Sequence, residues 1–172
     1  MANDVKDFGD YSVKGIKSFV GHDGYGFNAN LYRGKKKIAF CFDDARGGEV
    51  DIQWLDGYHG VEAQLLQTHV DSLPLAESGF GGMLPLKIDT GWFVTELVTK
   101  WEEERDLRKM QKQCKTKTLF RQADSKSNSY FVISAPLTDE LRTRLKAKHG
   151  EDIEIFNDVF AKGEIPSVLS TK

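Results

Sequence analysis

Cysteine and proline are scarce in this chain, which has 2 Cys and 4 Pro among its 172 residues. Cys41 and Cys114 stand far apart and follow no export signal, so the sequence does not indicate a disulfide scaffold. Apolar runs long enough to cross a bilayer, about 18–20 residues, are also missing. Residues 1–15 contain no apolar stretch of the kind that a signal peptide carries. We therefore expect a cytoplasmic protein without membrane contact.

An excess of charge of one sign is missing too, since 24 Lys and Arg stand against 26 Asp and Glu, for a net charge of −2. A dedicated nucleic-acid-binding protein is usually far more basic. Aromatic residues are plentiful, with 11 Phe, 5 Tyr and 3 Trp. They supply apolar surface whose burial can offset the entropy of the unfolded chain. The composition therefore predicts a folded globular protein.

The first third of the chain alternates between apolar and polar residues, with the period of two that is typical of strands with one buried face. Phe27–Tyr32 and Val50–Trp54 follow this pattern, and Gly15–Val20 is a shorter β-prone run. Ile38–Phe42 is apolar at every position, which predicts a central strand covered on both faces. Short glycine-rich turns separate the runs, and such turns join antiparallel neighbours. We therefore expect an antiparallel β-meander.

Helical periodicity follows the strands. Residues spaced four apart predict one face of a first helix, Val61, Leu65, His69 and Leu73, with Leu66 and Val70 beside them. A second helix is expected from about residue 91 to residue 113, capped by Thr90. Its apolar positions become sparse after Trp101, so we expect its outer half to lie in solvent.

The last third of the chain predicts a hairpin and one more helix. Thr118–Arg121 and Tyr130–Ser134 are β-prone runs joined by a polar loop. Thr138 can cap a helix that Gly150 would end. The tail after Gly163 is expected to fray.

Strands grouped first and helices grouped afterwards are typical of α+β proteins. We predict an α+β fold in which an antiparallel N-terminal β-meander is packed by helices and followed by a C-terminal hairpin and helix. Residues 1–172 are expected to form a single domain. An organisation in two lobes, 1–73 and 90–172 joined by a long loop of residues 74–89, is the alternative.

The loop of residues 74–89 is unusually long for a connection in a compact domain. Phe80, Met83 and Leu84 lie in it among glycines, without the period that would bury them. These side chains either fold back on the core or form an exposed apolar tip, and exposed apolar patches mark partner sites. They are therefore candidate partner-binding residues.

The strongest polar signal is a basic stretch between residues 105 and 121. It is either a solvated helix face or a surface for weak, non-specific phosphate contacts, since no motif of sequence-specific recognition accompanies it. The candidate polyanion-binding residues are Arg105, Arg108, Lys109, Lys112, Lys115, Lys117 and Arg121.

Other patterns supply no catalytic or metal site. Residues 21–26 (GHDGYG) share glycines with phosphate-binding loops, but no helix follows them, so a structural turn is the simpler interpretation. The carboxylates between residues 43 and 51 lack the spacing of a calcium loop. The four histidines lack zinc spacing, and His69 is expected to be a packed core residue. We expect no cofactor and no metal.

The segment Lys14–Gly48 (KGIKSFVGHDGYGFNANLYRGKKKIAFCFDDARGG) resembles the opening of small uncharacterised proteins carried by bacteriophages and plasmids. In those proteins an x-G-x-G-F-x-A-x-L-Y-x-x-G-K-K hairpin leads into a strand and a D-x-G-G turn. The resemblance covers about a fifth of the chain and implies no activity or catalytic residue. It implies an accessory product of a mobile element, and such products often bind a host factor.

Three functions are compatible with the sequence. The first is non-catalytic binding of a host protein, with inhibition of host defence or DNA metabolism as its effect. The second is non-specific nucleic-acid binding through residues 105–121. The third is an enzyme whose site is assembled only in the fold. Because no catalytic motif is present, we expect a binding protein.

Overall fold

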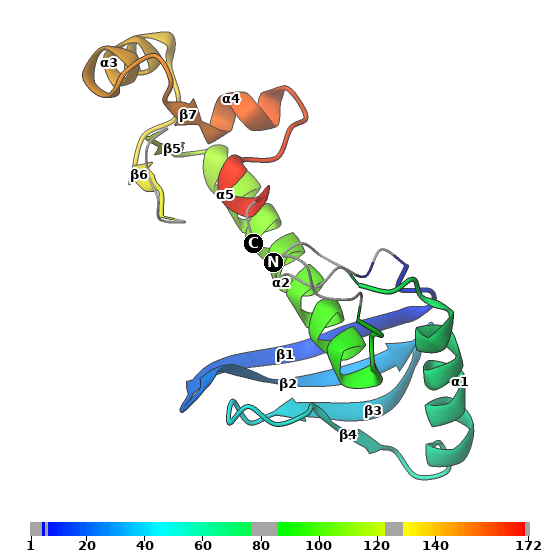
Figure 1. The fold of residues 1–172 in the computed structure, drawn as a ribbon. Coiled ribbons are helices and arrows are strands. Elements are labelled where there is room, and N and C mark those ends of the chain that lie inside the picture. Colours follow the sequence, from blue (N-terminus) through cyan, green and yellow to red (C-terminus); the bar gives the residue numbers. More distant parts are fainter. Residues whose placement is uncertain (1–4, 6, 77–85, 123–128, 171–172) are drawn as a thin grey trace. The chain divides into compact units, whose positions relative to one another are not determined.

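The computed structural model describes residues 5, 7–76, 86–122 and 129–170. The chain has an α+β fold and divides into two compact units (Figure 1). We call them the N-terminal unit (Asn3–Trp101) and the C-terminal unit (Glu102–Lys172). Each unit has its own β-sheet. None of the described helices combines the length and the apolar character that crossing a membrane requires.

The N-terminal unit is built on an antiparallel sheet of strand order β1-β2-β3-β4. These strands are β1 (Tyr11–Gly21), β2 (Gly24–Arg33), β3 (Lys36–Asp43) and β4 (Asp51–Trp54). The predicted meander is confirmed. β1 is longer than expected, because a β-bulge between Lys14 and Lys17 shifts its register and lets pairing continue on both sides.

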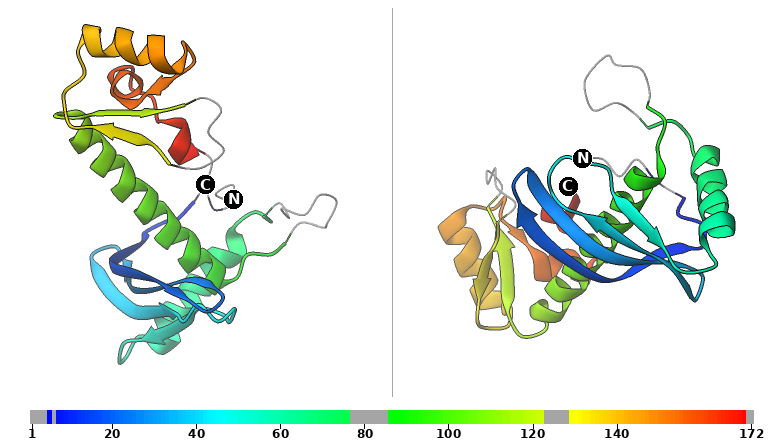
Figure 2. Two further views of the ribbon diagram at one scale, coloured as in Figure 1. Left: turned by 90° about the vertical axis from the view of Figure 1, so that its left-hand side faces the viewer. Right: turned by 90° about the horizontal axis from the view of Figure 1, so that it is seen from below.

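Two helices pack on one face of this sheet, which we call the inner face: α1 (His59–Ser72) and the first half of α2 (Thr90–Cys114) (Figure 2). The middle of the inner face is buried, with Ala39 and Cys41 of β3 at no exposure. Phe40 and Phe42 alternate with them and lie half-buried on the opposite, outer face. No described helix of this unit lies over the outer face, so the prediction that β3 is covered on both faces is wrong.

The buried face of α1 agrees with the prediction at Leu66 and Val70 only. Val61 and Leu65 are exposed, at 64% and 41%, whereas the helix buries Glu62, Leu66 and Val70. The burial of Glu62 was not predicted, because a carboxylate occupies a core position there. The buried stripe is therefore shifted by one residue along the helix.

The cap of α2 and the exposure of its second half both differ from the prediction. Asp89, and not Thr90, caps α2, because its Oδ1 accepts a hydrogen bond of 2.7 Å from the backbone N–H of Trp92. Beyond Trp101 the helix enters a second apolar core, where Met110 is 6% exposed. The prediction that this half lies in solvent is therefore wrong for one face of the helix, whereas the other face is exposed.

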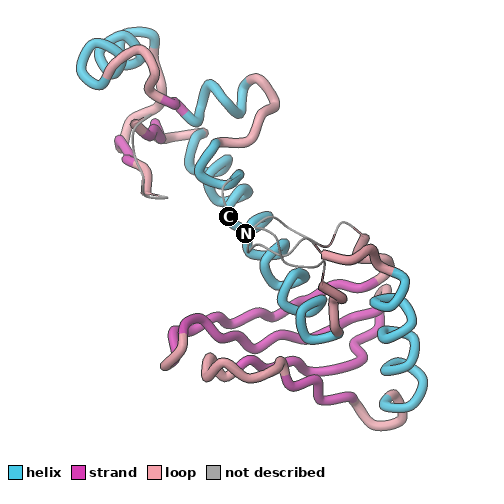
Figure 3. Tube along the Cα trace, in the orientation of Figure 1, coloured by secondary structure: helices cyan, strands magenta, loops and turns pink. Residues whose placement is uncertain are grey.

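The C-terminal unit contains a small antiparallel sheet of order β6-β5-β7, with β5 (Thr118–Arg121), β6 (Phe131–Ile133) and β7 (Glu154–Ile155) (Figure 3). Its helices besides α2 are α3 (Asp139–His149), α4 (Phe156–Ala161) and α5 (Ser167–Ser170). Antiparallel pairing of β5 with β6 confirms the predicted hairpin.

The ends of α3 also agree with the sequence. Thr138 Oγ1 accepts a hydrogen bond from the backbone N–H of Leu141, and Gly150 follows the helix with a φ of 97°. The predicted fraying of the tail is wrong for residues 166–169. Pro166 and Val168 are buried, because α5 packs into the apolar core that Met110 and Phe156 share.

Candidate functional site

The second half of α2 carries an exposed basic stripe. Arg105, Arg108, Lys109 and Lys112 are all exposed and lie at spacings of three and four residues. At 3.6 residues per turn, these spacings place the four side chains within an arc of roughly 100°. Lys115 is exposed directly after the last helical turn. We call these five residues the basic stripe.

The opposite side of the same helix is apolar and holds the stripe in place. Met110 is buried against Leu119, Phe156 and Val168, and Cys114 is packed against the same group. Met110 is about 140° away from Arg105 around the helix axis, so burial of the one directs the other into solvent. The orientation of the basic stripe therefore follows from the core of the C-terminal unit.

Two of the five cations are paired with neighbours on the helix. Arg108 forms an i,i+4 ion pair with Glu104 at 3.4 Å, and Arg105 contacts Asp106 at 3.2 Å. Exposed pairs of this kind contribute little to stability and leave the side chain able to reorient. Lys109, Lys112 and Lys115 take part in none of the ion pairs observed among the described residues. The stripe thus keeps a positive surface.

Two of the seven predicted basic residues lie apart from the stripe. Lys117 and Arg121 are half-buried beside and within β5. Arg121 Nη1 donates a 3.0 Å hydrogen bond to Ser167 Oγ, which ties the guanidinium to α5. Arg121 is therefore part of the packing of the C-terminal unit, and Lys117 lies apart from the stripe.

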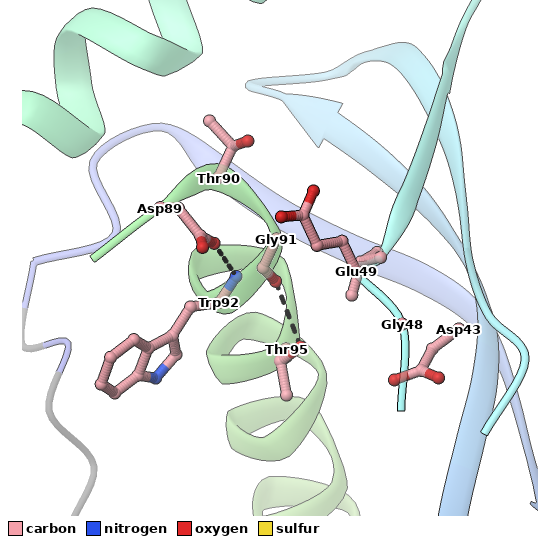
Figure 4. Close-up of a pocket in the computed structure, with 9 residues that line it drawn as sticks. Asp43, Gly48, Glu49, Asp89, Thr90, Gly91, Trp92 and Thr95 are labelled. Carbon is pink, nitrogen blue, oxygen red and sulfur yellow. Dashed lines mark hydrogen bonds between the residues drawn. The ribbon is translucent and has the colours of Figure 1, made fainter. Parts of the chain in front are cut away.

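The N-terminal unit contains a pocket of about 330 Å³ at the start of α2 (Figure 4). Three carboxylates line it, those of Asp43, Glu49 and Asp89. Asp43 already accepts a hydrogen bond from the backbone N–H of Ala45, and Asp89 is the cap of α2. Both carboxylates therefore have a structural role, and the hydroxyl of Thr95, which also lines the pocket, donates to the carbonyl oxygen of Gly91.

The acidic segment between residues 43 and 51 does not form one site. Asp43 lies on the inner face of the sheet opposite Phe27, whereas Asp51 pairs with Phe42 on the outer face. The sheet itself separates the two carboxylates. Among the described residues, no group of three His, Cys, Asp or Glu side chains is placed to hold a metal ion.

The glycine-rich segment of residues 21–26 is a tight hairpin end between β1 and β2. A Cβ atom on Gly26 would lie 2.4 Å from the carbonyl oxygen of Asp43, and one on Gly21 would lie 2.4 Å from the Cβ of Ala45. Close approach of the neighbouring backbone therefore explains these glycines. Tyr25 and Val20, which pair across this hairpin, are 81% and 75% exposed.

The candidate partner-binding residues of the long loop, Phe80, Met83 and Leu84, lie outside the described residues.

The two cysteines and His69 pack in the apolar cores. Burial raises the pKa of Cys41 to about 12, and burial also raises that of Cys114, so both thiols stay protonated near neutral pH. His69 packs against the rings of Tyr11 and Phe93, each at 5.4 Å, as expected for a packed histidine.

Comparison of the chain with protein-family models, with curated proteins and with solved structures finds no match.

Proposed function

We propose that the protein binds nucleic acid without sequence specificity, through the basic stripe of α2. The observation that carries the proposal is the alignment of Arg105, Arg108, Lys109 and Lys112 along one exposed face of a helix whose other face is anchored. Phosphate contacts need cations at the surface and no base-reading groups. A row of Lys and Arg along a rigid helix satisfies that requirement.

The geometry favours phosphate contacts over a merely solvated helix. A solvated helix face commonly mixes charges of both signs at i,i+4 spacing. Here one such pair is present, Glu104 with Arg108. Lys109 and Lys112 have no acidic residue four positions before or after them. The partner of the stripe is therefore expected to be a polyanion.

Charge reversal tests the proposal. We expect Lys109→Glu with Lys112→Glu to weaken binding of a fluorescein-labelled 20-base-pair DNA duplex by about tenfold or more in fluorescence anisotropy, because two phosphate contacts become repulsive. The matched control is Arg144→Glu with Lys148→Glu, an equal charge change on two exposed positions of α3. An equal loss in both variants, or no loss in the first, would contradict the role of the stripe.

Binding to a host protein is the second candidate function, and the β1–β2 hairpin end favours it. Val20 and Tyr25 form a cross-strand apolar pair that the fold leaves exposed. The resemblance of this segment to proteins of bacteriophages and plasmids makes a bacterial host protein the partner class. Val20→Ser with Tyr25→Ser should abolish capture of such a partner from a bacterial lysate while the melting temperature stays unchanged. Capture that persists would exclude this surface.

A further inference from the structure

The outer face of the N-terminal sheet carries aromatic side chains that the fold does not fully bury. Four rings contribute to it, and each residue is half-buried: Phe19, Tyr32, Phe40 and Phe42. The helices α1 and α2 lie on the inner face (Figure 2). We call these four residues, with the amides Asn28 and Asn30 between them, the aromatic face.

The strand register places these side chains in adjacent rows. Phe42 is opposite Asn28, and Phe40 is opposite Asn30. The rings of Phe19 and Phe42 have centroids 6.2 Å apart. Phe19 in turn lies over Gly26, where a Cβ atom would approach its ring to 2.8 Å. The sheet therefore holds the rings in fixed positions along its surface.

The amides between the rings retain capacity for hydrogen bonds. The Oδ1 atom of Asn28 is buried and has no hydrogen-bond partner among the described residues. A buried acceptor without a donor is costly, and a base amino or imino group could donate to it only after the amide turns outward. Asn30 Nδ2 donates to the carbonyl oxygen of Lys14 at 3.3 Å, which leaves the oxygen of its amide as an acceptor site.

The lysines on this face indicate that its ligand carries negative charge. Lys14, Lys17 and Lys37 lie on the same side of the sheet, opposite Asn30, Asn28 and Tyr32. Lys14 Nζ is 4.5 Å from the centre of the Tyr32 ring, so this cation is part of the aromatic face. The one carboxylate in these rows is that of Asp51, which accepts a hydrogen bond from Gln53. A neutral sugar or an apolar peptide would have no use for the lysines.

We infer that the aromatic face binds single-stranded nucleic acid, with bases stacked on Phe40 and Phe42 and phosphates near Lys14 and Lys17. Stacking on aromatic side chains of a sheet is a general means of holding unpaired bases, and it tolerates any base because each has a π-face. The bases of a duplex are hidden in its own stack and cannot reach these rings. The inference rests on the proposed function and names the form of nucleic acid that the N-terminal unit selects.

Replacement of the rings by aliphatic side chains separates stacking from burial. In the full chain, Phe40→Leu with Phe42→Leu should weaken binding of a fluorescein-labelled 12-residue oligodeoxythymidine by about tenfold or more. Affinity for the 20-base-pair duplex should change by less than about twofold, because the duplex is bound through phosphates at the stripe, which these substitutions do not alter. The matched control is Tyr25→Leu, which removes an exposed aromatic ring from the inner side of the same sheet. This control should bind both probes like the wild type.

Each outcome bears on one of the two proposals. If the leucine variant keeps its wild-type melting temperature and binds the oligodeoxythymidine as wild type does, the aromatic face is not a binding site. An equal loss of affinity for both probes would also overturn the inference, because it would show no discrimination of single strands. If instead the oligodeoxythymidine responds to the rings while reversal at Lys109 and Lys112 leaves duplex binding intact, the inference stands and the proposed role of the stripe fails. A wild-type chain that binds neither probe would overturn both.

Discussion

Arg33 and Glu62 form a bidentate ion pair that joins β2 to α1. Arg33 Nε donates to Glu62 Oε2 at 2.6 Å, and Nη2 donates to Oε1 at 2.7 Å. The carboxylate side chain is 4% exposed and the guanidinium side chain 38%. A charged group thus occupies the core face of α1, and its compensation depends on a residue 29 positions earlier in the chain.

The pair makes the stability of the N-terminal unit depend on pH. The hydrogen bonds from Arg33 lower the pKa of Glu62 below its ordinary value of 4.5. A carboxyl group with a lowered pKa in the folded state stabilises the fold fully above its unfolded pKa, and the contribution is lost as the pH falls through the folded value. We therefore expect the urea midpoint to fall on acidification from pH 6 to pH 3.

Glu62→Gln should remove most of this dependence. The variant should be less stable at pH 7 by about 1–3 kcal/mol, because the guanidinium loses its charged acceptor, and the difference from wild type should shrink toward pH 3. Glu49→Gln, at an exposed position of the same unit, is the control and should change neither value. A constant difference between wild type and Glu62→Gln at all pH values would contradict the account.

The core of the N-terminal unit depends more on α2 than on β3. Phe93 is fully buried among aromatic rings, at 5.8 Å from both Phe8 and Tyr11, whereas Phe40 is half-buried on the outer face. Phe93→Ala should cost about 3–5 kcal/mol, because it leaves a cavity that the surrounding rings cannot close. Phe40→Ala should cost clearly less.

Tryptophan fluorescence in urea measures this difference directly, since all three tryptophans, Trp54, Trp92 and Trp101, belong to the N-terminal unit. Equal midpoints for the two alanine variants would mean that the outer face is buried after all.

Much of the fold was predictable from local patterns. The strand runs, the β5–β6 hairpin and the cap at Thr138 depend on residues close in sequence, and the structure confirms them. Leu66 and Val70 were expected on the buried face of α1, but Glu62 was not. Glu62 is polar, and only the distant Arg33 makes its burial possible.

The candidate sites were likewise predictable where they depend on local sequence and not where they depend on distant contacts. The basic stripe could be read from the spacing of Arg105, Lys109 and Lys112, because helix geometry is local. The sequence did not show that Arg121 is tied to Ser167, since that contact spans 46 positions. The aromatic face was missed because the apolar run around Phe40 was interpreted as a strand covered on both faces. The polar residues that alternate in β2, Asn28 and Asn30, were the available signal that one face is open.

Asn157 connects three segments of the C-terminal unit through its side chain. Its Nδ2 donates to the carbonyl oxygens of Cys114 and Lys117 at 2.9 and 2.8 Å, and its Oδ1 accepts from the backbone N–H of Leu119 at 3.0 Å. The end of α2, the turn after it and β5 thereby meet at one residue of α4. Asn157→Ala should destabilise this unit by about 2–3 kcal/mol, because it leaves backbone groups without partners.

Far-UV circular dichroism follows both units, whereas tryptophan fluorescence follows the N-terminal one. We expect Asn157→Ala to lower the melting temperature seen by circular dichroism while the fluorescence transition stays in place. Gln111→Ala, at an exposed amide of α2 in the same unit, is the control and should leave both transitions unchanged. A shift of the fluorescence transition by Asn157→Ala would show that the two units do not unfold independently.

The central claim is that the basic stripe binds nucleic acid by neutralising phosphates, and a salt titration of duplex binding tests it most directly. Log K for the 20-base-pair duplex should fall linearly with log salt, with a slope of about −4 if four or five phosphates are neutralised. Neutralising two stripe residues, with Lys109→Gln and Lys112→Gln, should reduce the magnitude of the slope by about 2. The same glutamine changes at Arg144 and Lys148 should leave it unchanged. A slope near zero, or a slope that Lys109→Gln and Lys112→Gln do not alter, would contradict the account.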